Sequence, residues 1–197
     1  MLINYRDVFQ NILPPERLHF EGEVMEFHSR DETEDFHFRP GVVAEPVSTT
    51  EVSALIRMAF EHEVPVTAGG ARTGLSGGAL AIQGGLVLSL RRMNKILLID
   101  EKNHQVIVEP GVITEVLQNT VSEKGLFYAV DPASQGTCTI GGNIAENSGG
   151  PRAVKYGVTK DWVLNLEVVL PDGRVIETGA NTLKNSTGYN LTGLIVG

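Results

Sequence analysis

The stretch that decides the fold runs from Val64 to Leu90, VPVTAGGARTGLSGGALAIQGGLVLSL. Two strand-like runs, 65–68 and 85–90, form its ends, and seven glycines occur from Gly69 to Gly85. Glycine loses more conformational freedom on folding than any other residue, so a cluster of glycines is costly unless the backbone needs it. The stretch therefore predicts a loop whose backbone either packs very closely or binds a ligand.

The residues before this stretch predict a helix between two strands. GVVAEP (41–46) is typical of a short strand that ends at Pro46. Ser48 followed by Glu51 has the spacing of a capping box. The apolar positions that follow have helical spacing and predict one buried face: Val52, Leu55, Ile56, Ala59 and Phe60. Strand, helix and strand in this order predict a βαβ unit with parallel strands.

The rest of the chain predicts more β structure. KILLID (95–100) and QVIVEPG (105–111) indicate an antiparallel pair, and a helix is expected from a Thr114 cap to Lys124, with Gly125 as its stop. A second glycine-rich stretch, 131–152, follows. WVLNLEVVL (162–170) and RVIETG (174–179) then predict a hairpin. The first forty residues predict only a short helix near 4–13 and an irregular arm.

Composition excludes several classes of protein. The chain has 197 residues, 42% of them hydrophobic, and a net charge of −8, which argues against nucleic-acid binding. No apolar run reaches the roughly 20 residues that span a bilayer, and the N-terminus does not resemble a secretory signal. Cys138 is the only cysteine, which fits a reducing, cytoplasmic compartment. The acidic run RDETED (30–35) is interpreted as a solvated loop, because its spacing does not match a calcium loop.

Two glycine-rich segments that follow or join strands are suited to binding a phosphate through backbone N–H groups. Spacing excludes the two commonest phosphate loops. The P-loop needs a Gly-Lys pair, which the chain lacks, and the dinucleotide pattern G-x-G-x-x-G does not occur. The alternative interpretation is a pair of tight turns with close backbone packing, and composition alone does not decide between the two.

The motifs resemble those of one flavoprotein family. They are GGARTGLSGGAL (69–80), GGLVLSLRRMNKILLID (84–100), VEPGV (108–112), DPAS (131–134), TIGGNIAENSGGPRAVKYGVTKDWVLNLEVVLPDG (139–173) and LKNSTGYNLTGLIVG (183–197). Over residues 38 to 197 the chain is similar to the FAD-binding (PCMH-type) domain of the vanillyl-alcohol-oxidase superfamily. Within it, the chain resembles FAD-linked dehydrogenases of D-2-hydroxy acids, such as the glycolate oxidase catalytic subunit, D-lactate dehydrogenase and D-2-hydroxyglutarate dehydrogenase.

The resemblance implies an α+β fold with two lobes and FAD extended between them. We expect an N-terminal helix and arm in 1–40, a small parallel βαβ lobe in 41–94, and a larger, mainly antiparallel lobe with helices in 95–197. The resemblance also implies that the base and the arginines that bind the substrate carboxylate lie in a C-terminal substrate domain. We expect that domain to be absent from this chain and therefore assign no catalytic residue and no metal ligand.

The resemblance also implies which residues bind FAD. The first loop would wrap the pyrophosphate with backbone N–H groups and hydroxyls, and its candidates are Gly70, Ala71, Arg72, Thr73, Gly74, Leu75 and Ser76. The segment from Pro132 to Gly150 would line the flavin, and its candidates are Pro132, Ser134, Thr139, Gly142, Asn143, Asn147 and Gly149.

The first loop departs from the family at Arg72. Relatives commonly carry an arginine where Gly69 stands and a glycine where Arg72 stands. The Arg72 guanidinium can pair with phosphate or be solvated on the shoulder of the loop, and both interpretations stay open here. If Arg72 needs a positive φ, strain is expected there. None of the histidines lies in a glycine-rich loop and Cys138 is interpreted as a small buried hydrophobe, so we expect non-covalent FAD.

Two functions remain from the sequence. One is the FAD-binding half of an enzyme that oxidises D-2-hydroxy acids such as glycolate or D-lactate, inactive by itself. The alternative is a non-catalytic flavin-binding or interaction subunit that needs a partner chain. A homodimer through exposed apolar surface is compatible with both, and so is a peripheral association with a membrane through a partner.

Overall fold

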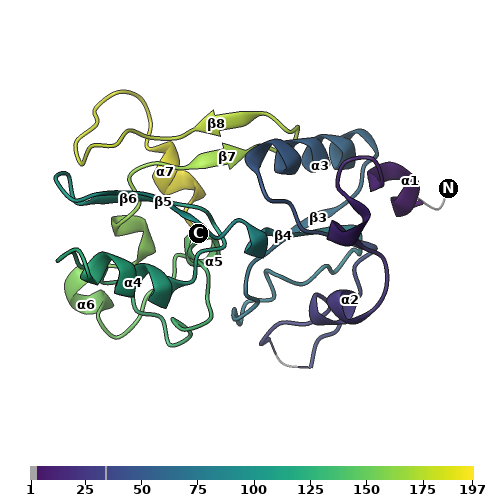
Figure 1. Cartoon of the computed structure of the whole chain (residues 1–197), viewed down its shortest axis with the longest axis horizontal. Helices are drawn as coiled ribbons and strands as arrows, with labels where there is room; N and C mark the ends of the chain where they lie inside the picture. The colour runs from purple at the N-terminus through teal and green to yellow at the C-terminus, as the bar shows by residue number, and fades with distance from the viewer. Residues whose placement is uncertain (1–3, 34) are drawn as a thin grey trace. The chain divides into compact units, whose positions relative to one another are not determined.

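The computed structural model describes residues 4–33 and 35–197, and the chain divides into two compact units (Figure 1). The first unit comprises Met1–Met93 and Val169–Val175, and the second comprises Asn94–Val168 and Ile176–Gly197. Each unit is described separately below.

The first unit contains a four-stranded sheet in the order β1-β2-β4-β3. β2 (Val42–Ala44), β4 (Leu86–Ser89) and β3 (Val66–Gly69) are parallel, and β1 (Leu18–His19) pairs antiparallel with β2. The helix α3 (Thr49–Glu61) joins β2 to β3, so the predicted βαβ unit is confirmed, with β4 inserted between its two strands. β1 was not predicted from the sequence, because a two-residue strand is too short to show a period.

Helices cover both faces of this sheet, which explains why β2 and residues 86–88 of β4 are apolar and buried at successive positions. On one face, alternate residues Val42, Ala44, Leu86 and Leu88 pack with α3 and with Phe9 of α1 (Tyr5–Phe9). On the other face, Val43 and Val87 pack with Met25 of α2 (Glu23–Phe27). Figure 1 shows α3 and α2 on opposite sides of the sheet. The carboxyl ends of β3 and β4 therefore lie on a scaffold that is packed on both sides.

Side chains fasten the N-terminal arm to this scaffold. The 3₁₀-helix Pro15–Arg17 ends at Arg17, whose guanidinium forms a two-point pair with Glu51 at 2.6 and 2.7 Å. Ser48 caps α3 by accepting the N–H of Glu51, as the capping pattern predicts. α1 is shorter than the expected helix over 4–13.

The second unit contains a small sheet and several short helices, and the residues of a second small sheet are divided between the two units, with Val169–Val175 in the first. β5 (Ile96–Asp100) and β6 (Gln105–Val108) form the predicted antiparallel pair, and β7 (Glu167–Val169) and β8 (Val175–Glu177) form the predicted hairpin. The helices are α4 (Thr114–Ser122), α5 (Ile140–Glu146), α6 (Ala153–Tyr156) and α7 (Leu191–Ile195), and 3₁₀ turns occur at Leu90–Arg92 in the first unit and at Thr159–Asp161 here. The α+β class is therefore confirmed.

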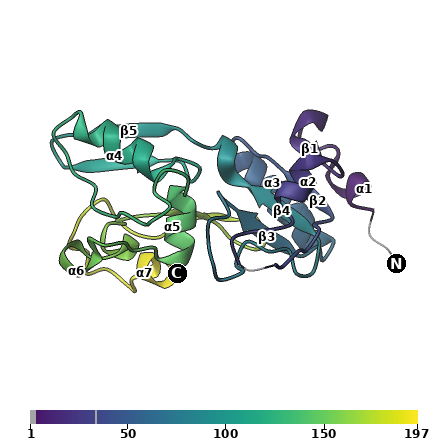
Figure 2. The same cartoon turned by 90° about the horizontal axis from the view of Figure 1, so that it is seen from below.

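The core of the second unit lies between β5–β6 and the helices α4 and α5. Val112, Leu117, Val121 and Ile140 are buried together, and Ile144 packs against them. Figure 2 shows α4 beside β5 as Figure 1 does. The expected cap at Thr114 is wrong, because Ile113 is the N-cap residue and Thr114 is the first helical residue. The stop at Gly125 is confirmed by its φ of +72°. Within the described residues, no helix has the length and apolar character to cross a membrane.

Candidate functional site

The first glycine-rich loop leaves the carboxyl end of β3 and offers a row of free backbone donors. Among the described residues, nothing accepts a hydrogen bond from the N–H groups of residues 70–75. Such groups are strong donors that folded proteins rarely leave unpaired when they are buried. The residues of this run are half-buried or exposed, apart from the buried Arg72. Consecutive unpaired N–H groups in a loop are suited to binding an anion such as a pyrophosphate.

Arg72 lies within this loop, but its side chain is not solvated. Only 6% of the residue is exposed, so the interpretation of a solvated arginine on the loop shoulder is wrong. Its φ is +62°, so Arg72 has the positive φ at which strain is expected for a residue that is not glycine. Nε donates a hydrogen bond to the backbone carbonyl of Arg30. Burial lowers the pKa of the Arg72 guanidinium, and the carboxylate of Asp31 opposes that shift.

Several buried polar atoms near Arg72 have no hydrogen-bond partner among the described residues. They are Nη1 and Nη2 of Arg72, Oδ2 of Asp31, Nε2 of His28 and Oγ of Ser89. The charge of Arg72 helps to lower the pKa of His28, although burial is the larger cause. Ser89 pairs in register with Gly69, and Nη1 of Arg72 lies 3.7 Å from the position that a Cβ on Gly69 would occupy. We call His28, Asp31, Arg72 and Ser89 the buried polar cluster.

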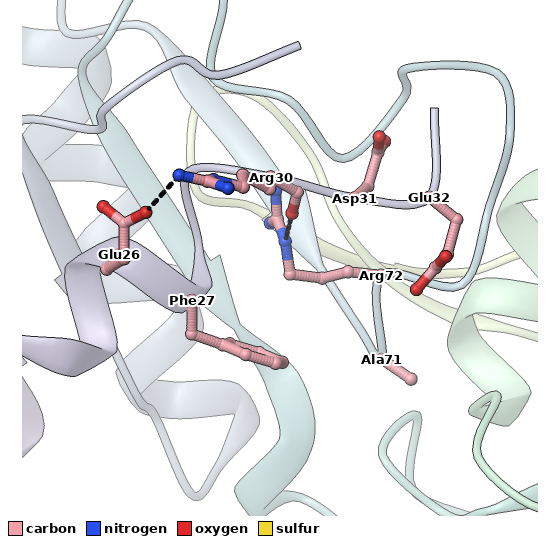
Figure 3. A pocket seen from close by; sticks show the side chains of 7 residues that line it. All are labelled: Glu26, Phe27, Arg30, Asp31, Glu32, Ala71 and Arg72. Atoms are coloured by element: carbon pink, nitrogen blue, oxygen red, sulfur yellow. Dashed lines mark hydrogen bonds and ion pairs between the residues drawn. The ribbon is translucent and has the colours of Figure 1, made fainter. Parts of the chain in front are cut away.

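A pocket opens beside the buried polar cluster (Figure 3). Its volume is about 380 Å³, and it is lined by Glu26, Phe27, Arg30, Asp31, Glu32, Ala71 and Arg72. Figure 3 shows the Arg72 side chain reaching the Arg30 backbone, while the Arg30 side chain turns toward Glu26, to which it bonds at 2.9 Å. The two arginines therefore have different roles. The Arg72 guanidinium joins the first loop to the backbone of the acidic run at residue 30, whereas the Arg30 side chain pairs with Glu26.

The acidic run 30–35 also contacts the first loop through Thr33. The Thr33 hydroxyl accepts a hydrogen bond from the N–H of Gly77 at 2.9 Å. The Asp31 carboxylate accepts the Thr33 N–H at 2.8 Å and shapes the turn. Part of the run, residue 34, lies outside the described residues. The interpretation as a solvated loop missed these contacts, because residues about 40 positions apart along the sequence make them.

The second glycine-rich segment is folded differently from the first. Residues 134–138 form a turn in which the carbonyl of Ser134 accepts the N–H groups of Thr137 and Cys138, each at 2.8 Å. Thr139 then caps α5 by accepting the N–H of Gly142. Most of the backbone N–H groups in this segment are therefore used within it, and the helix was not predicted because its glycines suggested a loop.

Asn143, a candidate for contact with the flavin, is bonded inside the unit. Only 2% of it is exposed, and its side-chain amide donates to the Thr114 hydroxyl at 2.7 Å. The same hydroxyl lies 3.2 Å from the Cys138 sulfur. Cys138 is 5% exposed, which confirms the interpretation of it as a small buried side chain. Cys138 contributes to a pKa of about 12 for Tyr128, for which burial is the main cause.

The end of the second segment is tightly packed. Asn147 adopts a left-handed conformation, with φ +47°, and its side-chain oxygen accepts the N–H of Lys160 at 3.0 Å. A Cβ on Gly149 would lie 3.0 Å from Val158, and a Cβ on Gly150 would collide with the Asp131 carbonyl. Gly142 and Ser134 are half-buried, and Pro132 is buried. Close packing therefore accounts for part of the glycine content here, as the alternative interpretation expects.

Among the described residues, no group of three or more histidine, cysteine, aspartate or glutamate side chains could hold a metal ion. The backbone donors of the first loop are the feature that best fits the pyrophosphate of a dinucleotide cofactor, and the loop follows a parallel strand as such loops do in other nucleotide-binding folds.

Comparison with known proteins gives the class of this domain. The chain belongs to the family of FAD binding domains, because the profile of that family matches residues 40–179. It is 48% identical to the glycolate oxidase subunit GlcD of Bacillus subtilis, over 86% of this chain and 36% of that protein. It is 43% identical to a D-lactate dehydrogenase of Anaerostipes hadrus, over 94% of this chain and 39% of that protein. The chain thus spans about two fifths of the length of these curated relatives.

Solved structures give the same fold. An alkyldihydroxyacetonephosphate synthase superposes on 98% of this chain and 37% of its own, with a TM-score of 0.83 and 23% identity. The 4-ethylphenol oxidase of Gulosibacter chungangensis covers 97% of this chain and 39% of its own, with a TM-score of 0.78 and 26% identity. The chain is therefore a flavoprotein domain of the vanillyl-alcohol-oxidase fold, related in sequence to the FAD-linked dehydrogenases of D-2-hydroxy acids.

Proposed function

We propose that this chain binds FAD without a covalent link and serves a flavin-dependent oxidoreductase that oxidises D-2-hydroxy acids such as glycolate or D-lactate. The names of the relatives at 43–48% identity support that substrate class. The observation that carries the cofactor assignment is the run of backbone N–H groups at residues 70–75, which no residue in the described ranges 4–33 and 35–197 accepts.

The proposed site has two parts. In the first loop, backbone donors and hydroxyls hold the pyrophosphate, from Gly70, Ala71, Arg72, Thr73, Gly74, Leu75 and Ser76. In the second segment, small and polar residues contact the flavin and its ribityl chain, from Pro132, Ser134, Thr139, Gly142, Asn143, Asn147 and Gly149. The buried bond from Asn143 to Thr114 favours a supporting role for Asn143 over a direct contact.

When bound, FAD supplies the hydride acceptor, and the protein's part is to bind and orient it. The residues of this chain supply anion-binding donors and a close-packed backbone. We propose that the catalytic base and the groups that bind the substrate carboxylate are in the part of the relatives that this chain does not match.

Non-covalent attachment is proposed on two observations. The first loop contains no histidine, and Cys138 of the second segment is buried beside Thr114. We expect acid precipitation of the loaded protein to release all of its flavin into the supernatant. Flavin fluorescence that stays with the polypeptide on a denaturing gel would refute this.

A second candidate function is a flavin-binding subunit that needs a partner chain or a second copy of itself. Exposed large apolar side chains in the second unit favour it, because such groups commonly mark a protein interface. They are Val154, Leu183, Tyr189 and Leu194. We propose a cytoplasmic location for either case. Sedimentation as a single monomeric species up to high concentration would count against self-association.

The experiment that tests the cofactor assignment is a titration of the purified chain with FAD, monitored by flavin fluorescence and the visible spectrum. ADP should compete, because it shares the pyrophosphate, whereas riboflavin should bind much more weakly. Binding of FAD should also raise the thermal midpoint of the chain, since a ligand that binds only the native state stabilises it. The absence of a spectral change and of thermal protection would overturn the assignment.

A further inference from the structure

The side chain of Arg72 is placed to hold the first loop in shape. Only 6% of the residue is exposed to solvent. Its Nε donates a hydrogen bond to the carbonyl of Arg30, which lies 42 residues earlier in the chain. The left-handed backbone at Arg72 is strained for a residue with a side chain. Such strain persists only where the surrounding structure compensates for it, so the buried contacts of the guanidinium point to a function.

The buried polar cluster contains donors and acceptors that are buried without a hydrogen-bond partner among the described residues. Nη1 and Nη2 of Arg72 are donors only. Asp31 Oδ2 is an acceptor, and Ser89 Oγ can accept. His28 Nδ1 donates to the Val24 carbonyl at 2.9 Å, so the neutral ring keeps its lone pair on Nε2. Burial, together with the charge of Arg72, lowers the pKa of His28 and so favours this neutral form. The guanidinium bond formed among the described residues is the one from Nε to the Arg30 carbonyl, so that bond joins the loop to residues 28–33.

We propose that Arg72 is a positioning residue: its guanidinium clamps the arm at residues 28–33 to the first loop, and FAD binding and the closure of the arm are thereby coupled. The Thr33 to Gly77 hydrogen bond is the second point of this clamp. The role differs from a direct contact with phosphate, because the guanidinium is directed into the arm and not toward the free N–H groups.

The clamp explains how an arginine at position 72 leaves the backbone donors free. Nη1 of Arg72 lies 3.7 Å from where a Cβ on Gly69 would be, so a side chain at position 69 would begin beside the present guanidinium. In the variant Gly69→Arg with Arg72→Gly, we expect the guanidinium from position 69 to bond the Arg30 carbonyl, and the glycine at 72 relieves the strained φ. This double variant tests whether the arginine is needed at position 72 itself or can also act from position 69.

Hydrogen exchange of the full-length chain without FAD tests the clamp. In Arg72→Gly, amides in 28–33 and 70–77 should exchange about tenfold faster or more, as expected for loss of a charged hydrogen bond. The double variant should return exchange to within about threefold of the wild type.

Arg30→Gln is the matched control, since it removes a positive charge from the same pocket but keeps the backbone carbonyl, and it should leave the exchange unchanged. If Arg72→Gly does not fold, Arg72→Lys carries the test, because an ammonium lacks the fork of the guanidinium. Unchanged exchange in either variant would overturn the clamp.

The coupling is tested with FAD and rests on the proposed function. FAD should slow exchange of the arm in the wild type, and Arg72→Gly and Arg72→Lys should each weaken FAD binding about tenfold. Millimolar guanidinium should restore binding to Arg72→Gly, whereas methylammonium should not, and a purely structural loss would show no such rescue. Full affinity in Arg72→Lys with a loosened arm would overturn the positioning role in favour of a charge contact. A wild type that does not bind FAD would overturn the proposed function and the coupling, while the exchange of the free chain would still decide the clamp.

Discussion

The two glycine-rich segments use glycine for opposite reasons. Among the described residues, nothing accepts the backbone N–H groups of residues 70–75, and the loop is joined to residues 30–33 by the Arg72 side chain and the Thr33 hydroxyl. In residues 131–150 the backbone bonds to itself in a turn and in α5, and glycines allow the main chain to pack against Pro110 and Asp131. The first segment therefore leaves backbone donors available, whereas the second uses its donors within the protein and packs its glycines closely.

We expect the two segments to differ most in the free energy of unfolding that is lost when a methyl group is added to one glycine of each. In Gly150→Ala the new Cβ would collide with the Asp131 carbonyl, so we expect a loss of about 3 kcal/mol or more in the free energy of unfolding. In Gly69→Ala the nearest atoms lie 3.5 to 3.7 Å away, at ordinary contact distance, so we expect a change within about 0.5 kcal/mol. Urea unfolding followed by circular dichroism measures both. Equal costs would mean that the two segments do not differ in packing.

The second segment is also held by a buried hydrogen bond, which Thr114→Val removes. The change would leave the Asn143 amide unpaired at 2% exposure, and we expect a loss of about 2 kcal/mol. Thr120→Val on the same helix is the matched control. Its hydroxyl bonds the Val116 carbonyl at an exposed position, so its loss should cost well under 1 kcal/mol. Similar costs for the two variants would argue that the buried network does not hold the segment.

The arm beside the first loop should respond to pH through His28. Burial lowers the pKa of His28 below its ordinary value of 6.5, the positive charges of Arg72 and Arg91 lower it further, and only the Val24 carbonyl and Glu45 oppose the shift. The unfolded chain therefore binds the proton more readily. The His28 contribution to stability is complete above about pH 6.5 and falls as the pH decreases below that value, by at most about 1.4 kcal/mol per pH unit.

His28→Gln should flatten this loss between about pH 6.5 and 5 without removing the decline at lower pH that carboxylates cause. His62→Gln, at an exposed position in the same unit, is the control and should leave the slope unchanged. Chemical unfolding at a series of pH values gives both slopes. An unaltered slope in His28→Gln would show that the imidazole is not kept neutral by the buried polar cluster.

Local patterns predicted most of the scaffold but little of the clamp. The period of the apolar residues in α3 and the apolar runs of β2 and β4 are visible in the sequence, because each element buries its own side chains. α5 was missed because two glycines in its first turn suggested a loop, and its stability comes from the Thr139 cap and from burial of Ile140. The other residues of the buried polar cluster come from the C-cap of α2, the acidic run and β4, and no local pattern links positions so far apart. The departure of position 72 from the family was the one signal that pointed to them.

The smallest test compares the two segments by one hydroxyl each. Thr33→Val removes the acceptor for the Gly77 N–H, so we expect the first loop to lose about 0.5 to 1 kcal/mol of local stability. Thr137→Val removes an exposed bond to the Ser134 carbonyl, which also accepts two backbone N–H groups, so the turn should keep its shape. Native-state hydrogen exchange measures both losses, and only Thr33→Val should expose residues 75–78 to faster exchange. The first loop is held by contacts with residues 30–33, whereas the second segment is held by hydrogen bonds within itself. Faster exchange around 134–138 in Thr137→Val would therefore contradict the conclusion that the backbone bonds alone hold the second segment.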